Sequence, residues 1–294
     1  MKKIIFFILI LLAGCASNPQ IPKWVINTPQ DNNNYLYATG SDYTKNLAIQ
    51  KALNNAASKL NVNISSEFII NRGVFKNKAY NDVAQQINAK VTNIQINNYQ
   101  IIKSQKIDNK IYVLIKINKN KLKQNLITQI NLSLDKINNL LSNSYGFQKV
   151  KNSYQALKII SNTQQKILIL QSLNQNISNY INLLQKYNKQ AKYNIQHTFF
   201  SINTNYFKKQ ITDVLSNYLA ISNNASNKIQ IQISLKKAYI LNQYIIVGKC
   251  FINFGNQTKT IKFKGQSYTD YKTARIKASS NLKKALKQIM KDIL

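Results

Sequence analysis

Residues 35–60 read YLYATGSDYTKNLAIQKALNNAASKL and join a short strand pattern to an alanine-rich helix pattern. We expect a strand over residues 35–39, ended by Gly40, and a helix over residues 44–60. One side of this helix collects, at helical spacing, Leu47, Ala48, Ala52, Ala56 and Leu60. Because alanine side chains are small, this helix can lie close against a sheet. The pattern therefore predicts an α+β fold built on helix-on-sheet packing.

The residues that follow predict the rest of the first sheet. Alternating apolar and polar residues predict strands over 62–70, 94–106 and 110–117, and a further helix is predicted over 78–89. The last two strands flank Asp108-Asn109, a short polar turn typical of a β-hairpin. The prolines near Trp24 predict an extended lead-in, with Trp24 packed on the domain's edge. We therefore expect an N-terminal α/β domain of sandwich type over residues 22–119.

Residues 120–193 contain two heptad-like seams. The first seam is Ile127, Ile130, Leu134, Ile137 and Leu141, and the second is Leu170, Leu173, Ile177, Tyr180, Leu184 and Tyr187. Residues 142–146 predict the end of the first helix, and residues 161–163 are a candidate interruption of the second. We expect an antiparallel helical hairpin, or a version with three helices, whose seams face each other. Pairing of the seams with another copy or another protein is the alternative.

Residues 194–294 predict a second α+β domain in the order β-α-β-β-β-α. Its strands are expected at 197–201, 229–238, 244–254 and 258–266, and its helices at 206–219 and 269–294. That order favours an antiparallel sheet with helices on one face. Ala274 and Ala278 follow Gly265 much as Ala48 and Ala52 follow Gly40. Either the two α/β units are related or they share one way of packing, and we favour the second interpretation.

The amino terminus has the order of an export signal. Lys2 and Lys3 precede an apolar run over residues 4–12, two small residues and Cys15. This order resembles the lipobox of bacterial lipoproteins. The resemblance implies that residues 1–14 are a signal peptide, that Cys15 carries diacylglycerol and an N-acyl chain, and that residues 15–21 are a tether. A plain secretory signal is one alternative, and a membrane span is another, although the run has about half the roughly 18 residues a span needs.

Residues 20–120 carry a second resemblance. Pro22-Lys23-Trp24, the Y-x-Y-x-x-G of residues 35–40, the helix with Ala48 and Ala52, and the later hairpin are similar to the Lpp-twenty family of small outer-membrane lipoproteins. Relatives of that family include accessory proteins of the flagellar basal body. The resemblance implies a scaffold or assembly role and offers no catalytic residues to carry over. With Ala16 after the lipidated cysteine, it implies the outer membrane, facing the periplasm by default.

The charge balance is strongly positive, with 41 basic and 9 acidic residues and a formal net charge of +32. Such a surface attracts polyanions, which in an envelope include lipopolysaccharide, anionic lipid headgroups, teichoic-like polymers and extracellular DNA. A solvated basic surface with no specific partner is the alternative. We do not expect nucleic acid to be the main partner, because an export signal is present and neither zinc-finger nor helix-turn-helix spacing occurs.

The last predicted helix carries the candidate polyanion-binding residues, namely Lys272, Arg275, Lys277, Lys283, Lys284, Lys287 and Lys291. Its apolar side is expected to consist of Ile276, Leu282, Leu286, Ile289 and Ile293. We favour an amphipathic helix that docks on the sheet with its lysines in solvent. The alternative is an interfacial helix that contacts lipid or an anionic glycan.

Residues suited to catalysis are scarce. The chain has one histidine, His197, which is predicted on a strand in a structural role, and its nine acids are scattered. Cys250 lies in an apolar run and is expected to be a buried, inert thiol, with an intermolecular disulfide or a reactive thiol as alternatives. No spacing suggests a metal site, a nucleophile elbow or a phosphate-binding loop. We therefore expect no enzyme activity and no cofactor besides the lipid on Cys15.

The sequence thus predicts a non-catalytic outer-membrane lipoprotein that acts as an envelope scaffold, an assembly factor or a protein-binding factor, and self-assembly is one form of that role. The alternative function is a surface binder of anionic glycan, lipid or DNA.

Overall fold

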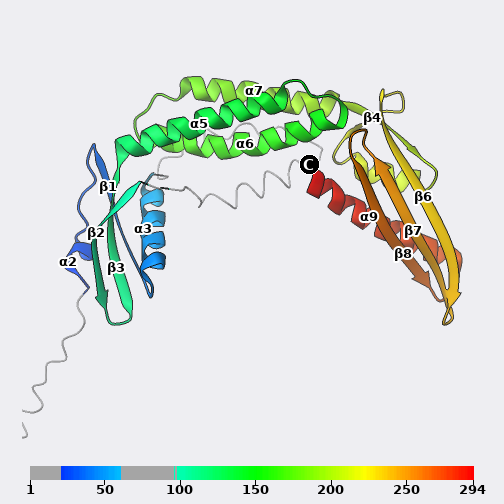
Figure 1. Ribbon diagram of the computed structural model, residues 1–294, viewed down its shortest axis with the longest axis horizontal. Coiled ribbons are helices and arrows are strands. Elements are labelled where there is room, and N and C mark those ends of the chain that lie inside the picture. The colour runs from blue at the N-terminus through cyan, green and yellow to red at the C-terminus, as the bar shows by residue number, and fades with distance from the viewer. Residues whose placement is uncertain (1–20, 61–95, 97) are drawn as a thin grey trace, which may run out of the picture. The chain divides into compact units, whose positions relative to one another are not determined.

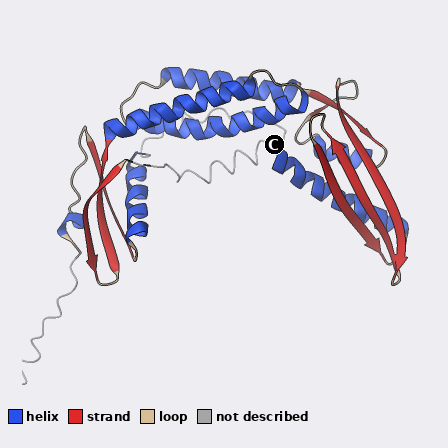
Figure 2. Ribbon diagram, in the orientation of Figure 1, coloured by secondary structure: helices blue, strands red, loops and turns tan. Residues whose placement is uncertain are grey.

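The computed structural model describes residues 21–60, 96 and 98–294. They form a mixed α+β protein with two sheets and several long helices, as the sequence predicts (Figure 1, Figure 2). The chain divides into two compact units, and the boundary that follows the first sheet lies at Asn125. The strand predicted at 62–70, the helix predicted at 78–89 and the signal with Cys15 lie outside the described residues.

The N-terminal unit is an antiparallel sheet of strand order β1-β3-β2 with one long helix against it. Its elements are α2 (Lys23–Ile26), β1 (Tyr35–Asp42), α3 (Lys45–Leu60), β2 (Tyr99–Ile107) and β3 (Lys110–Asn118). The predicted hairpin is confirmed, with Asp108 at a φ of 51° in its turn. The prediction of an extended segment before β1 is wrong at Trp24, because this half-buried residue lies in α2, a single helical turn. Pro22 directly precedes that turn, where its missing N–H costs nothing.

Gly40 lies inside β1, so the prediction that the strand ends there is wrong. A Cβ added to Gly40 would overlap the backbone of α3 at the carbonyl oxygen of Ala48 and the nitrogen of Ala52. Ala48 and Ala52 are themselves fully buried. Glycine is therefore needed here because the helix backbone rests directly on the strand. Leu47, predicted on the same side, is 51% exposed because the contact is centred on the alanines.

The residues between the two sheets form three helices, so the three-helix alternative is the observed one. They are α5 (Lys119–Leu141), α6 (Gly146–Ser172) and α7 (Ser178–His197). The break predicted at 142–146 is confirmed. The interruption at 161–163 is wrong, because the buried Thr163 satisfies its hydroxyl inside α6 by donating to the carbonyl of Ile159 (2.8 Å). The second break follows Leu173, where Asn174 adopts a φ of 58°, a conformation that asparagine tolerates.

The seam residues are mostly buried within the structure. Those below a tenth exposed are Ile130, Leu134, Ile137, Leu141, Leu170, Leu173, Ile177, Leu184 and Tyr187. The second seam is divided between α6 and α7, which pack against each other. Intramolecular packing therefore accounts for the seams.

The C-terminal sheet has the strand order β5-β4-β6-β7-β8. Its elements are β4 (Phe199–Thr204), α8 (Lys208–Leu215), β5 (Ala220–Ile221), β6 (Asn227–Ile240), β7 (Gln243–Asn253), β8 (Thr258–Ser267) and α9 (Tyr271–Ile293). The sheet is mixed rather than antiparallel, because β4 pairs in parallel with both β5 and β6. Beyond the end of β4, the Asn205 side chain continues the ladder by exchanging two 3.0 Å hydrogen bonds with the backbone of Ile233.

Helix α9 packs on β8 and β7 as the amphipathic pattern predicts. Its buried side includes Ala274, Ala278, Leu282, Leu286, Met290 and Ile293. The prediction that Ile276 belongs to this side is wrong, because its side chain is 61% exposed. A Cβ on Gly265 would overlap the backbone of α9 at Ala274 and Ala278, as at Gly40. In both units an edge strand has a glycine as the third residue from its end and is followed by a helix that folds back over it. The order along the chain differs, because the neighbouring hairpin follows β1 but precedes β8.

Aromatic side chains join the helices of the second unit to its sheet. Phe147, at the start of α6, stacks on Phe254 with ring centroids 4.4 Å apart and meets the edge of Phe200 at 6.4 Å. The buried hydroxyl of Tyr154 donates to the carbonyl of Tyr218 (3.0 Å). These contacts place α6 and the C-terminal sheet in one continuous core.

The substitution Gly265→Ala tests this packing. We expect the free energy of unfolding to fall by about 3 kcal/mol, because the added methyl group meets backbone atoms that cannot rotate away. Urea unfolding of the chain from Ala16 to Leu294 measures the change. Gln266→Ala, on the exposed neighbour, is the control, and equal unfolding midpoints for the two variants would contradict the close approach.

Candidate functional site: a lysine face on the C-terminal sheet

The predicted basic residues of α9 lie on its outer side. Lys272, Arg275, Lys277, Lys284, Lys287 and Lys291 are exposed and Lys283 is half-buried. Arg275 packs on aromatic rings, with its guanidinium carbon 5.5 Å from the ring centroids of both Tyr206 and Phe207. The helix therefore presents its cations around a broad solvent-facing arc and uses one of them to hold the segment before α8.

A denser basic surface lies on the opposite side of the sheet. Residues that alternate with the buried ones along β6, β7 and β8 point away from α9. The strand register aligns Lys236, Val247 and Lys264 in one row across the three strands. The next row is Ser234, Lys249 and Lys262. We call this surface the lysine face and define it by its exposed lysines, Lys228, Lys236, Lys249, Lys262 and Lys264.

The lysine face concentrates positive charge without an acidic partner in its own strands. None of the five strands contains an aspartate or a glutamate. Lys249 and Lys262 lie directly opposite each other on β7 and β8. Like charges in that relation destabilise a sheet. An anion bound between them would relieve the repulsion.

An apolar strip accompanies these cations. Val247 and Phe251 are 47% and 38% exposed on the same side of β7 as Lys249. The Lys249 ammonium lies 4.5 Å from the ring centroid of Phe251, a cation–π distance that orients the lysine. The face can therefore bind an extended anion by charge and by contact with apolar groups.

Sequence reasoning missed this surface although its signal was present. Lys262 and Lys264 alternate with the buried Ile261 and Phe263, so their outward direction follows from strand periodicity. Their alignment with Lys249 and Lys236 depends on strand register, which the sequence pattern did not specify.

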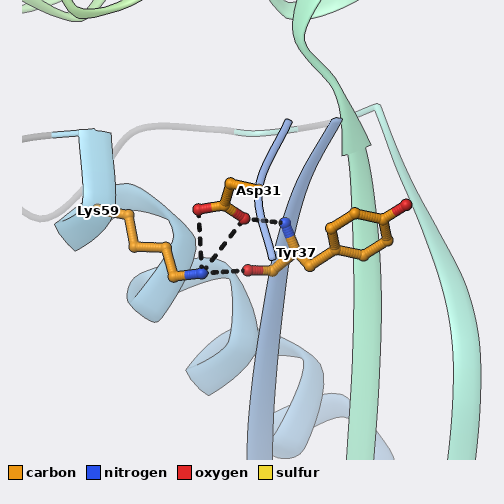
Figure 3. Close-up of polar contacts among 3 residues, drawn as sticks. All are labelled: Asp31, Tyr37 and Lys59. Carbon is orange, nitrogen blue, oxygen red and sulfur yellow. Dashed lines mark hydrogen bonds and ion pairs between the residues drawn. The ribbon is translucent and has the colours of Figure 1, made fainter. Parts of the chain in front are cut away.

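The N-terminal unit holds a polar cluster that stabilises its lead-in segment (Figure 3). The Lys59 ammonium lies 3.2 Å from Asp31 Oδ2 and donates to the carbonyl of Tyr37 (2.6 Å). The Tyr37 N–H in turn donates to Asp31 Oδ1 (2.8 Å). These contacts tie the segment before β1 to the last turn of α3, which is a structural role.

A small polar hollow of about 410 Å³ lies beside Gly40. Its lining residues are Val25, Thr39, Gly40, Ser41, Lys51, Asn54 and Asn55. The Lys51 ammonium pairs with Asp42 at 2.7 Å, and this hydrogen bond lowers the pKa of the Asp42 carboxyl. Asn55 donates to the carbonyl of Thr39 (2.8 Å). These internal bonds occupy the Lys51 ammonium and the Asn55 amide, so we prefer the lysine face as the candidate site.

His197 ends α7 and does not lie on a strand, which corrects the sequence prediction. Its ring stacks on Tyr193 with centroids 4.0 Å apart, and Nδ1 lies 3.0 Å from the Tyr193 carbonyl oxygen. The sequence pattern was misleading because the chain enters β4 only two residues later. Among the described residues, no three His, Cys, Asp or Glu side chains are grouped as metal ligands.

Cys250 is 1% exposed on the inner face of β7, which confirms the predicted burial. Burial raises the pKa of its thiol to about 12. Because the thiolate is the reactive form, we expect alkylation by iodoacetamide at mildly alkaline pH to be roughly a hundredfold or more slower in folded protein than in urea. Mass spectrometry of labelled Cys250 measures both rates. Equally fast labelling of the folded chain would show that the thiol is accessible.

Comparison with known proteins gives one informative likeness. No protein-family model and no curated protein matches the chain, so the Lpp-twenty resemblance remains a prediction. The structure is similar to the crystal structure of the secreted protein HP1454 from Helicobacter pylori, with a TM-score of 0.51 and 14% identity. The match covers 89% of this chain and 98% of that one. At this identity the likeness concerns the fold alone.

Over the described part of the chain, no helix combines the length and the apolar composition that spanning a bilayer requires.

Proposed function

We propose that this protein is a non-catalytic lipoprotein of the bacterial outer membrane, attached through lipid on Cys15, that binds an anionic glycan with its lysine face. The observation that carries the proposal is the direct opposition of Lys249 and Lys262 on an exposed sheet without acidic residues. An unfavourable charge arrangement on a folded surface is explained if a polyanion occupies it.

The composition of the face favours a glycan over single-stranded nucleic acid. Sheets that bind single-stranded RNA stack two or three bases on aromatic rings. Here the two lysine rows contain no aromatic residue; Phe251 lies in the adjacent row, opposite Gln232 and Thr260, and Lys249 lies over its ring. Phosphate, sulfate or carboxylate groups along a glycan require cations and no such stacking platform. Lipopolysaccharide is the envelope glycan that fits this chemistry.

Two observations support a place in the cell envelope. The amino-terminal residues have the order of a lipoprotein signal, and the similar Helicobacter pylori protein is described as secreted. An extracellular or envelope location is compatible with both. The lipid anchor would confine the lysine face near envelope polymers and raise its effective concentration there.

A scaffold or assembly role is the second candidate, and one edge of β6 favours it. The Ile233 backbone is satisfied by Asn205 at the end of β4. Over the described residues, no strand pairs with β6 on that side beyond Ile233. Because the backbone groups of every second residue point to that side, the N–H and C=O groups of Leu235, Lys237 and Tyr239 have no strand partner there. An extended segment of another protein, or of a second copy, could add a strand there.

Retention on immobilised dextran sulfate, with neutral dextran as the reference, tests the glycan proposal. The triple variant Lys249→Gln, Lys262→Gln and Lys264→Gln should elute at much lower salt than the parent, because fewer cations release fewer counterions. Its thermal stability should be equal or higher, since the opposed lysines are gone.

The matched control carries Lys277→Gln, Lys284→Gln and Lys287→Gln on α9 and has the same net charge. It should elute close to the parent. Equal losses in the two variants would show that total charge, rather than the lysine face, governs binding. A larger loss of retention in the control variant would show that the lysines of α9 form the binding site.

The lipid anchor has its own test. Cys15→Ala should yield protein that is no longer processed or labelled by radioactive palmitate, because the acyl acceptor is missing. Fractionation of cell membranes and incorporation of label measure the effect, with Cys250→Ala as the control. Palmitate labelling that persists in Cys15→Ala and disappears in Cys250→Ala would overturn the assignment.

A further inference from the structure

At the tip of the β6–β7 hairpin, Leu241 is unusual in two ways: it has a positive φ and its apolar side chain is exposed. Leu241 and Asn242 form the turn with φ values of 51° and 59°, the backbone of a type I′ turn. Glycine, asparagine and aspartate suit such positions, whereas the branched side chain of leucine is strained there. Leu241 is also 89% exposed, and its neighbour Ile240 is 55% exposed. An outlier of this kind points to a function for the side chain.

Tyrosines surround the tip. Tyr239 and Tyr244 face each other across the strands with centroids 4.9 Å apart, and Tyr271, at the start of α9, meets Tyr244 at 5.0 Å. Tyr268 is 73% exposed, and its hydroxyl accepts a 2.6 Å hydrogen bond from the Gln243 amide. Rings that combine an apolar body with a polar end are enriched where protein meets the headgroup layer of a membrane.

Cations lie farther back from the turn. Lys236 and Lys237 are exposed on β6, and the Lys237 ammonium lies 5.2 Å from the ring centroid of Tyr271. Lys272 follows Tyr271 on α9. The nearby Asp270 caps that helix, and its carboxylate accepts a 2.6 Å hydrogen bond from the Thr273 N–H. With increasing distance from the turn, the exposed side chains are therefore first aliphatic, then aromatic and then basic.

We propose that this hairpin tip inserts into an anionic lipid membrane, with Leu241 and Ile240 entering the boundary between headgroups and acyl chains. The order of residues matches the layers of such a surface. At about 3.3 Å per strand residue, the tyrosines lie about 7 Å behind Leu241 and Lys237 about 13 Å behind it. The headgroup layer is about 5–8 Å thick. The tyrosines therefore fall within the headgroups, and Lys237 lies just outside them, where its charge attracts the anionic lipid surface.

Charge selects the membrane as the occupant of this surface. If a second copy of the chain bound here, its lysines would face the lysines of the first copy and repel them. Anionic headgroups would instead neutralise the charge of these lysines. Two exposed aliphatic side chains at a turn are also too small an area for a stable protein interface, but they are sufficient to anchor a basic surface that lipid charge already attracts.

Vesicle sedimentation with the unlipidated chain from Ala16 to Leu294, which contains every described residue, tests the proposal. We expect binding to equimolar phosphatidylcholine–phosphatidylglycerol vesicles and little binding to phosphatidylcholine alone. Leu241→Gly should lower the partition coefficient about tenfold or more. The same change should keep or raise thermal stability, because glycine accepts the turn backbone without strain, so the loss cannot be ascribed to unfolding.

Ile276→Gln is the matched control, because it removes an exposed branched side chain from α9 of the same domain. It should bind vesicles as the parent does. In a second measurement, Leu241→Trp should show a blue-shifted emission when anionic vesicles are added, relative to the parent chain with Trp24 alone. Dextran sulfate retention should be unchanged in Leu241→Gly, because every lysine of the lysine face is retained, and this separates the tip from the glycan site.

Equal vesicle binding by Leu241→Gly and the parent would overturn insertion of the tip. Unchanged emission from vesicle-bound Leu241→Trp would also overturn it. Self-association of the parent that disappears in Leu241→Gly, without vesicle binding, would assign the tip to a second copy instead.

Discussion

The fold depends on the close approach of a helix backbone to a strand at a glycine. At Gly40 and at Gly265 a single methyl group would overlap the helix above it. Ala48 and Ala52 complete the contact in one unit, and Ala274 and Ala278 complete it in the other. The short distance leaves no space for large side chains, so each helix covers its sheet closely along one edge. The rest of each sheet must then be covered by other elements or remain in solvent.

This geometry explains where the charge of the chain is located. The side of the C-terminal sheet that faces α9 carries buried apolar residues such as Ile231, Cys250 and Ile261. A lysine buried beneath α9 would have to lose its hydration, and the strands place Lys249, Lys262 and their neighbours on the solvent-exposed side. In a chain with few acids, the exposed side of the sheet becomes a positive surface whose charges are close together because neighbouring strands are close together.

The same domain combines two features that cost stability. Opposed lysines repel across β7 and β8, and Leu241 occupies a backbone conformation that favours smaller residues. Features that cost stability are expected where a function uses them. Charge and apolar contact are complementary means of holding an envelope surface, and the two features place them at separate positions, on the face of the sheet and at the tip of its longest hairpin.

The sequence by itself predicted most of the long helices and strands of the described residues, the α+β class and the burial of Cys250, because alternation and helical spacing are local patterns. It did not predict the short elements α2 and β5, and it placed His197 on a strand, although this residue ends α7. It also contained the alanines and glycines of both close contacts, but it was misread at Gly40, where a residue that often ends a strand instead admits a helix. Only the tertiary structure decided that β4 joins its sheet in parallel and that Lys249 opposes Lys262. Those relations depend on register between segments distant in the chain, and no local periodicity encodes register.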